Sequence, residues 1–110
     1  MVNDMKFNKI TAIIQPAKLE IVEEELKKLC VPGISITKVH GYGEAPNFFT
    51  PDWTSAFARI EIYIESNKTE EVTQVIMNAA STGKEGDGIV AVLPVESLYQ
   101  IRTKNQVDIE

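Results

Sequence analysis

The sequence predicts an α+β fold of the ferredoxin-like type, in which two helices cover one face of an antiparallel sheet. Three observations lead to this class. The chain has 110 residues, enough for one domain spanning 1–110, and 44% of them are apolar. Four short segments alternate apolar and polar residues, and two longer segments carry helical apolar stripes. The order is therefore strand, helix, strand, strand, helix, strand, and the second face of the sheet must be wet or covered by another subunit.

The first half of the chain begins with a predicted strand over Phe7 to Ile14, whose second face carries Phe7, Thr11 and Ile13. Pro16 suits the first turn of a helix, and apolar residues then recur at three- and four-residue steps: Leu19, Val22, Leu26 and Leu29. Pro32-Gly33 is predicted to end this helix. Cys30 lies at the end of the apolar stripe, which favours a small buried residue over a reactive thiol.

The second half repeats the pattern. Strands are predicted over Ile34 to His40, ended by Gly41-Tyr42-Gly43, and over Phe57 to Ile64. A helix is predicted from Lys68 to Ala80, with Asn67 and Glu70 as a capping box. The strand Ile89 to Leu93 follows and is ended by Pro94, and the segment Val95 to Arg102 is left open between an extra turn and a last strand.

Composition excludes several classes of function. A net charge of −5 with only two arginines argues against a nucleic-acid surface. One cysteine rules out an internal disulfide and a multi-cysteine zinc site. No apolar run approaches the ~20 residues of a membrane helix, and the first residues lack the features of a secretory signal. We therefore expect a cytoplasmic protein without membrane insertion.

The segment Thr82 to Gly88 contains three glycines and directly precedes an apolar strand. Glycines at such spacing let several backbone N–H groups point into one concavity that holds an anion such as phosphate. A plain tight turn is the alternative interpretation. The spacing matches neither a Walker loop nor a dinucleotide-binding turn.

Several motifs in order resemble the PII signal-transduction family, and the resemblance runs from Lys9 to Arg102. The matching segments are residues 12–16, 31–39, 41–43, 59–62, 80–88, 92–96 and 101–103. The resemblance implies a homotrimer whose sheets face inward, with an adenine nucleotide (ADP, AMP or ATP) in each cleft between neighbouring subunits. It also implies a regulatory protein that acts on a membrane transporter or metabolic enzyme through a surface loop, the T-loop, here residues 44–58.

Site residues follow from the same resemblance. Phosphate contacts are expected on the backbone of Gly86, Asp87 and Gly88 and on the guanidinium of Arg102, with Thr82 and Gly83 in the same loop. Ser35 occupies the position whose hydroxyl helps to hold adenine from the neighbouring subunit. The backbone of Gly41, Tyr42 and Gly43 is expected to line the cleft at the base of the T-loop.

Three departures from the family pattern suggest a divergent PII-like subgroup, of the kind tied to inorganic-carbon, metal or other transport. Ile89 stands where the phosphate loop normally ends in a basic residue, and Gln100 replaces the first of two arginines. With fewer cations, ADP or AMP is expected to bind as well as ATP, or better. The loop 44–58 is short and Phe57 replaces a lysine, which argues against magnesium-assisted sensing of 2-oxoglutarate and against uridylylation.

Within that loop, Phe48, Phe49 and Trp53 are either anchors for a partner protein or aromatic residues that fold back over the sheet. His40 and Glu44 are too few to define a metal site. No catalytic residue is assigned, because no candidate base has a nucleophile or an activated water beside it. A slow nucleotide hydrolase and a trimeric divalent-metal tolerance protein remain the alternatives on the same scaffold.

Overall fold

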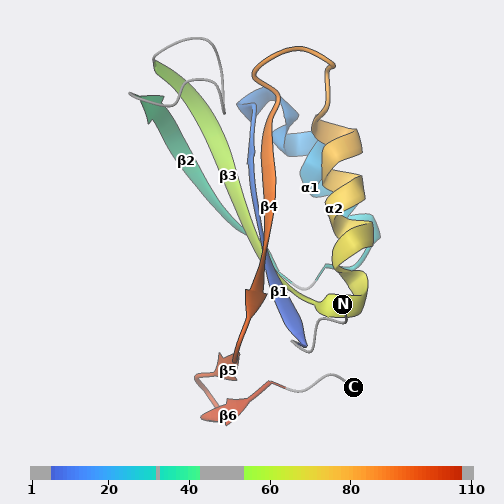
Figure 1. The fold of residues 1–110 in the computed structure, drawn as a ribbon, viewed down its shortest axis with the longest axis vertical. Helices are drawn as coiled ribbons and strands as arrows, with labels where there is room; N and C mark the ends of the chain where they lie inside the picture. The colour runs from blue at the N-terminus through green and yellow to red at the C-terminus, as the bar shows by residue number, and fades with distance from the viewer. Residues whose placement is uncertain (1–5, 32, 43–53, 108–110) are drawn as a thin grey trace.

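The structure, a computed structural model, describes residues 6–31, 33–42 and 54–107 (Figure 1). Its elements are β1 (Phe7–Ile14), a 3-10 turn η1 (Pro16–Lys18), α1 (Leu19–Lys28), β2 (Ser35–Tyr42), β3 (Thr54–Glu65), α2 (Ser66–Ala80), β4 (Gly88–Val95), β5 (Tyr99–Gln100) and β6 (Asn105–Gln106). The predicted α+β class and the predicted order of the first six strands and helices are confirmed.

The main sheet has the strand order β2-β3-β1-β4, and every neighbouring pair is antiparallel. Both helices lie on one side of this sheet (Figure 1). The ends of β1 and β2 and the starts of β3 and β4 therefore share one end of the sheet, which also carries the loop between α2 and β4. The β5–β6 hairpin lies beyond the other end.

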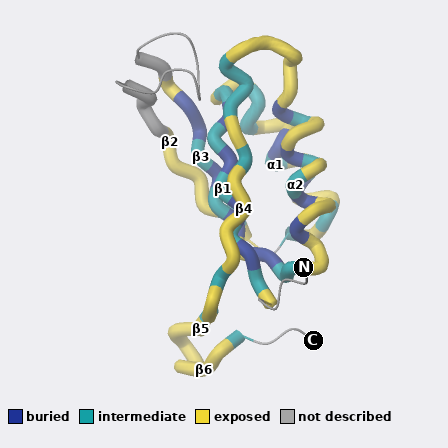
Figure 2. The backbone as a smooth tube through the Cα atoms, in the orientation of Figure 1, coloured by how far each residue is buried: buried dark blue, intermediate teal, exposed yellow. Residues whose placement is uncertain are grey.

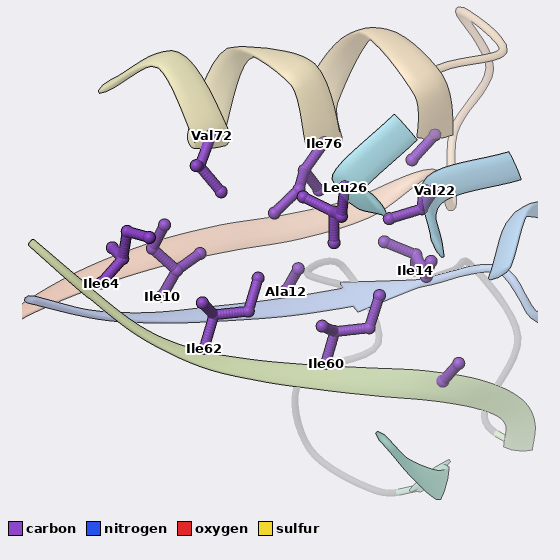
Figure 3. Close-up of a cluster of buried hydrophobic side chains, with 12 residues drawn as sticks. Ile10, Ala12, Ile14, Val22, Leu26, Ile60, Ile62, Ile64, Val72 and Ile76 are labelled. Atoms are coloured by element: carbon purple, nitrogen blue, oxygen red, sulfur yellow. The ribbon is translucent and has the colours of Figure 1, made fainter. Parts of the chain in front are cut away.

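The core lies between the sheet and the helices (Figure 3). Alternate residues of β1 and β3 point toward the helices, because successive side chains of a strand point to opposite faces. The predicted helical stripes supply the other half through Val22 and Leu26 of α1 and Val72 and Ile76 of α2. The buried cluster comprises Ile10, Ala12, Ile14, Val22, Leu26, Ala58, Ile60, Ile62, Ile64, Val72, Ile76 and Ala80.

Among the described residues no helix covers the opposite face of the sheet, and the charged residues near the centre of that face are paired. The Lys9 ammonium lies 2.6 Å from one carboxylate oxygen of Glu61, and the Arg59 Nε lies 3.6 Å from the other. The hydrogen bond from Lys9 lowers the pKa of the Glu61 carboxyl. On the β4 side of this cluster the face is apolar, and β4 is exposed along most of its length, with Leu93 47% and Tyr63 of β3 48% exposed (Figure 2).

The predicted ends of β2 and β3 were wrong, because the two strands pair further than expected. Gly41 and Tyr42 belong to β2 and pair with Ser55 and Thr54. Strand β3 therefore begins at Thr54 rather than Phe57, and residues 54–58 of the predicted loop are strand. Glycine does not end a strand when the ladder of the hairpin continues past it.

The predicted capping box of the second helix was also wrong. Helix α2 begins at Ser66, its N-cap is Glu65, and no side chain caps it. The Ser66 N–H instead donates to the Lys6 carbonyl, and the Thr69 hydroxyl donates to the carbonyl of Glu65. The helix thus follows β3 directly, and its first N–H is satisfied by the carbonyl of the residue that precedes β1.

Strand β4 continues through Pro94 to Val95, although Pro94 was predicted to end it. Proline is tolerated there because β4 is an edge strand, so one side of it needs no ladder hydrogen bond. The segment after β4, left open by the sequence, forms the β5–β6 hairpin. Its turn holds Arg102 and is closed by the bond from the Lys104 N–H to the Gln100 carbonyl.

Cys30 is exposed rather than buried, because it forms the C-terminal turn of α1. The Cys30 N–H donates to the Lys27 carbonyl and the Val31 N–H to the Leu26 carbonyl, which is the pattern of a Schellman cap. This geometry places Cys30 at φ 57°, a left-handed position where glycine is normally found.

Cys30→Gly is accordingly expected to stabilise the protein by about 0.5–1 kcal/mol, because it relieves the left-handed strain of a residue with a Cβ. The measurement is the unfolding free energy from a urea titration. Cys30→Ala keeps the strain and serves as the control. An equal gain from alanine would show that the backbone strain is not the cause.

Candidate functional site

The loop between α2 and β4 has the unusual backbone that its glycines predict. Gly83, Gly86 and Gly88 adopt φ values of 79°, 90° and 113°. Residues with a Cβ rarely adopt this region, so the loop depends on glycine at these positions. Such turns direct neighbouring N–H groups to one side, which is the arrangement that binds anions.

Asp87 holds the loop closed from within. Its carboxylate accepts hydrogen bonds from the N–H of Thr82 at 2.8 Å, from the N–H of Gly83 at 3.0 Å and from the Thr82 hydroxyl. The hydroxyl bond and the two N–H bonds hold the pKa of the Asp87 carboxyl below its ordinary value. The amides of Thr82 and Gly83 thus serve the loop's own carboxylate, and those of Gly86, Asp87 and Gly88 remain the candidates for an external anion.

The lowered pKa predicts how the loop responds to pH. A carboxyl whose pKa is lower in the folded protein contributes stability above its ordinary pKa, and this contribution is lost as pH falls through the folded pKa. The melting temperature of the protein is expected to exceed that of Asp87→Asn at pH 6, and the gap should close below about pH 4. Thermal melts between pH 6 and pH 3 measure it, with Glu71→Gln on the exposed side of α2 as the control. A gap that stays constant with pH would contradict the role of the carboxylate.

Two contacts seat the loop on the end of β1. The side-chain amide of Gln15 donates a hydrogen bond to the Gly86 carbonyl. Gly88 pairs with Ile14, and a Cβ at Gly88 would lie 1.8 Å from the Ile13 carbonyl oxygen. Only glycine therefore allows the loop to enter β4 at this position.

A hollow of about 180 Å³ opens beside the loop, between the last turn of α2 and the start of β4. Ile14, Met77 and Val90 contribute apolar walls, while Ser81 and Asp87 contribute polar groups. The loop thus stands between an apolar recess on the helix side and the uncovered face of the sheet.

The remaining predicted site residues do not gather at this loop within one chain. Arg102 is exposed and lies in the β5–β6 turn, at the end of the molecule opposite the loop (Figure 1). Ser35 begins β2 and pairs with Glu61, which itself pairs with Thr11, so Ser35 lies near the middle of the sheet rather than at the loop. Gly41 and Tyr42 lie at the loop end but on the other edge strand, with β3 and β1 between them and β4. Gly43, Phe48, Phe49 and Trp53 lie outside the described residues.

Neither Gln15 nor the Lys9–Glu61–Arg59 cluster could be recognised from the sequence as functional. The one available signal for Gln15 was its place between a predicted strand and a proline. The side chains of His40 and Glu44, the two residues considered for a metal site, lie outside the described part of the structure. Among the residues inside that part, no three His, Cys, Asp or Glu side chains come together.

Fold and loop together define a ferredoxin-like sandwich with a candidate anion-binding turn before its last core strand. Residues 7–105 match the sequence profile of the family described as "Nitrogen regulatory protein P-II". The chain belongs to this family of regulatory proteins, which confirms the resemblance noted in the sequence.

Individual relatives agree with the family match. The P-II protein of Cyanidium caldarium is 36% identical over 91% of this chain and 95% of its own length. The regulatory protein GlnK of Escherichia coli is 33% identical over 86% of this chain and 90% of its own length. The P-II homologue of Arabidopsis thaliana is 32% identical over 91% of this chain, which spans only 55% of that protein's length.

A crystal structure of Arabidopsis thaliana PII bound to citrate superposes with a TM-score of 0.80 at 29% identity. The match covers 98% of this chain and 92% of that one. Within the described part of this chain, neither helix has the length and apolar character needed to cross a membrane.

Proposed function

We propose that this protein is a cytoplasmic regulator that binds an adenine nucleotide in clefts between the subunits of a homotrimer. The nucleotide state sets the shape of the loop over residues 44–58, and that loop engages a membrane transporter or a metabolic enzyme. The protein acts as a sensor and carries out no chemistry on the nucleotide. Membership in the P-II family supports the regulatory role.

The backbone of the loop 82–88 is the observation that carries the proposal. Three left-handed glycines and the Asp87 clamp give the segment a defined shape before any ligand arrives. A preformed set of amides binds phosphate without first ordering the chain, which lowers the entropic cost of binding. The amides of Gly86, Asp87 and Gly88 are the proposed phosphate contacts.

The position of Arg102 supports a site shared between subunits. The eight residues of β4 separate the loop from the β5–β6 hairpin by roughly 26 Å. Arg102 therefore meets a phosphate at this loop only if it comes from a neighbouring copy. The apolar side chains that β4 exposes on the uncovered face, Ile89 and Leu93 among them, supply a surface on which copies can associate. We also assign the Ser35 hydroxyl to the neighbouring subunit, where it helps to hold the adenine.

The phosphate end of the proposed site has few cations. Ile89 follows the loop directly and is 37% exposed, and Gln100 precedes the turn that holds Arg102. A triphosphate carries more negative charge than this set of residues neutralises. ADP or AMP is therefore expected to bind at least as tightly as ATP, with no requirement for magnesium or 2-oxoglutarate.

Calorimetric titration of the protein with ADP, AMP and ATP tests both parts of the proposal. Ile89→Lys is expected to raise ATP affinity by about tenfold relative to AMP, because it adds a cation beside the loop. Ile89→Met is the matched control without charge. The absence of binding by all three nucleotides at millimolar concentration would refute nucleotide sensing, whereas tight ATP binding with negligible ADP and AMP binding would refute the proposed preference.

The partner-binding segment is assigned to residues 44–58, whose described part, 54–58, lies in β3. Phe48, Phe49 and Trp53 are the proposed anchors, because aromatic residues dominate the binding energy of protein interfaces. The adjoining backbone of Gly41, Tyr42 and Gly43 lines the nucleotide cleft in this proposal. It thereby connects the ligand to the loop.

A further inference from the structure

The hydrogen bond between Gln15 and the phosphate loop has no role in the function proposed above. The side-chain amide of Gln15 reaches across 71 positions of sequence to donate to the Gly86 carbonyl. A carbonyl only accepts hydrogen bonds, so the NH₂ group of Gln15 must face it. We propose that Gln15 is a positioning residue that sets the orientation of the Gly86–Asp87 peptide, and with it the anion affinity of the loop.

The geometry of a peptide group explains how one side chain controls an N–H it does not touch. In a trans peptide the C=O and the following N–H point in opposite directions, and no described peptide bond is cis. Fixing the Gly86 carbonyl on Gln15 therefore turns the Asp87 N–H away from Gln15. The hydrogen bond to the Gly86 carbonyl thus determines the direction in which the Asp87 N–H points.

This peptide needs such a restraint because glycine flanks it. Gly86 lies at φ 90°, and a residue without a Cβ rotates its next peptide group with little steric resistance. A half-turn of the peptide would present the Gly86 carbonyl in place of the Asp87 N–H, and a carbonyl oxygen repels phosphate. The side chain of Asp87 is already held by its hydrogen bonds with Thr82 and Gly83. The bond from Gln15 adds a restraint on the rotation of the Gly86–Asp87 peptide group.

The backbone of Gln15 is restrained on both sides. It lies between the last residue of β1 and Pro16, and proline restricts the preceding residue to the extended backbone it shows, φ −66° and ψ 137°. Its carbonyl accepts the Lys18 N–H at 2.9 Å, which anchors the 3-10 turn. The side chain therefore projects from a well-defined backbone, as a positioning group requires.

The test compares Gln15→Met, which keeps the length of the side chain but removes the donor, with the unchanged protein. This test rests on the proposed nucleotide site, so ADP is the probe and calorimetry the measurement. Gln15→Met is expected to weaken ADP binding about five- to tenfold at a temperature where both proteins are fully folded. Gln15→Glu should weaken it more, because a carboxylate repels both the Gly86 carbonyl and the phosphates. Gln74→Met, at an exposed position of α2, is the matched control and should bind ADP like the unchanged protein.

Unchanged ADP affinity in Gln15→Met would overturn the inference, even if its melting temperature fell. Should the unchanged protein bind no adenylate, the proposed function fails but the inference is still judged by NMR. The Asp87 amide signal is expected to shift and exchange faster with solvent in Gln15→Met and to stay in place in Gln74→Met. An Asp87 amide that is identical in all three proteins would overturn the inference on its own.

Discussion

Gly88→Ala is expected to lower the melting temperature by at least roughly 10 °C and to abolish nucleotide binding. A Cβ at this position would lie 1.8 Å from the Ile13 carbonyl oxygen and 2.9 Å from its carbonyl carbon, both backbone atoms of β1. The clash is relieved only by separating β1 from β4 where they pair, which also displaces the phosphate loop. The left-handed φ of 113° adds strain for any residue with a Cβ.

Substitutions at two other glycines distinguish the clash with β1 from the strain of a left-handed backbone. Gly83 has a left-handed φ of 79° but open space around its Cβ position, so Gly83→Ala is expected to cost only about 1–2 kcal/mol. Gly33 likewise has open space and lacks a left-handed φ, so Gly33→Ala should leave stability and binding unchanged. Thermal melts and ADP titrations of the three variants provide the comparison. If Gly88→Ala lowered the melting temperature and ADP binding no more than Gly83→Ala, the contact with the β1 backbone would not be the reason for glycine at position 88.

Leu93→Lys is expected to convert the proposed trimer into monomers and to remove nucleotide binding with it. Leu93 is 47% exposed on the uncovered face of the sheet and pairs with Lys9 across the β1–β4 ladder. A second ammonium beside Lys9 would be buried against a neighbouring subunit, at a cost of roughly 3 kcal/mol or more per interface. Without a neighbour, no Arg102 reaches the phosphate loop.

Ile21→Lys is the matched control, because Ile21 is 45% exposed but lies on α1, on the helix side of the sheet. Light scattering after size exclusion measures the mass of each variant, and calorimetry measures ADP binding. The control should remain trimeric and bind ADP. A Leu93→Lys protein that keeps the mass of a trimer would exclude this face as the interface.

The alternation of Phe7 to Ile14 and the apolar stripe of α2 were enough to predict a strand, a helix and the face each buries. Both patterns are local, since side-chain direction along a strand or helix depends only on position within that element. The boundaries were less predictable. The ends of β2 and β3 depend on how far two strands continue to pair, and Pro94 is acceptable only because β4 lies at an edge.

The candidate site divides in the same way. Glycine at positions 83, 86 and 88 could be recognised as a special turn, because glycine adopts a left-handed backbone without the strain that a Cβ causes. The hydrogen bonds from the Thr82 and Gly83 amides to Asp87 could not be predicted, because the same spacing of residues also suits an open loop. Cys30 was misjudged for a related reason, since its exposure follows from the cap geometry rather than from its place in the apolar stripe.

From its sequence alone this protein has a recognisable strand and helix order, a buried face for each element, a glycine turn and membership in the P-II family. The strand order and register then determine which distant residues meet: Gln15 with Gly86, Gly88 with Ile13, and Arg102 with neither. The physical reason is that periodicity encodes the direction of a side chain within one element. Contacts between elements arise only when the whole sheet brings their backbones into register.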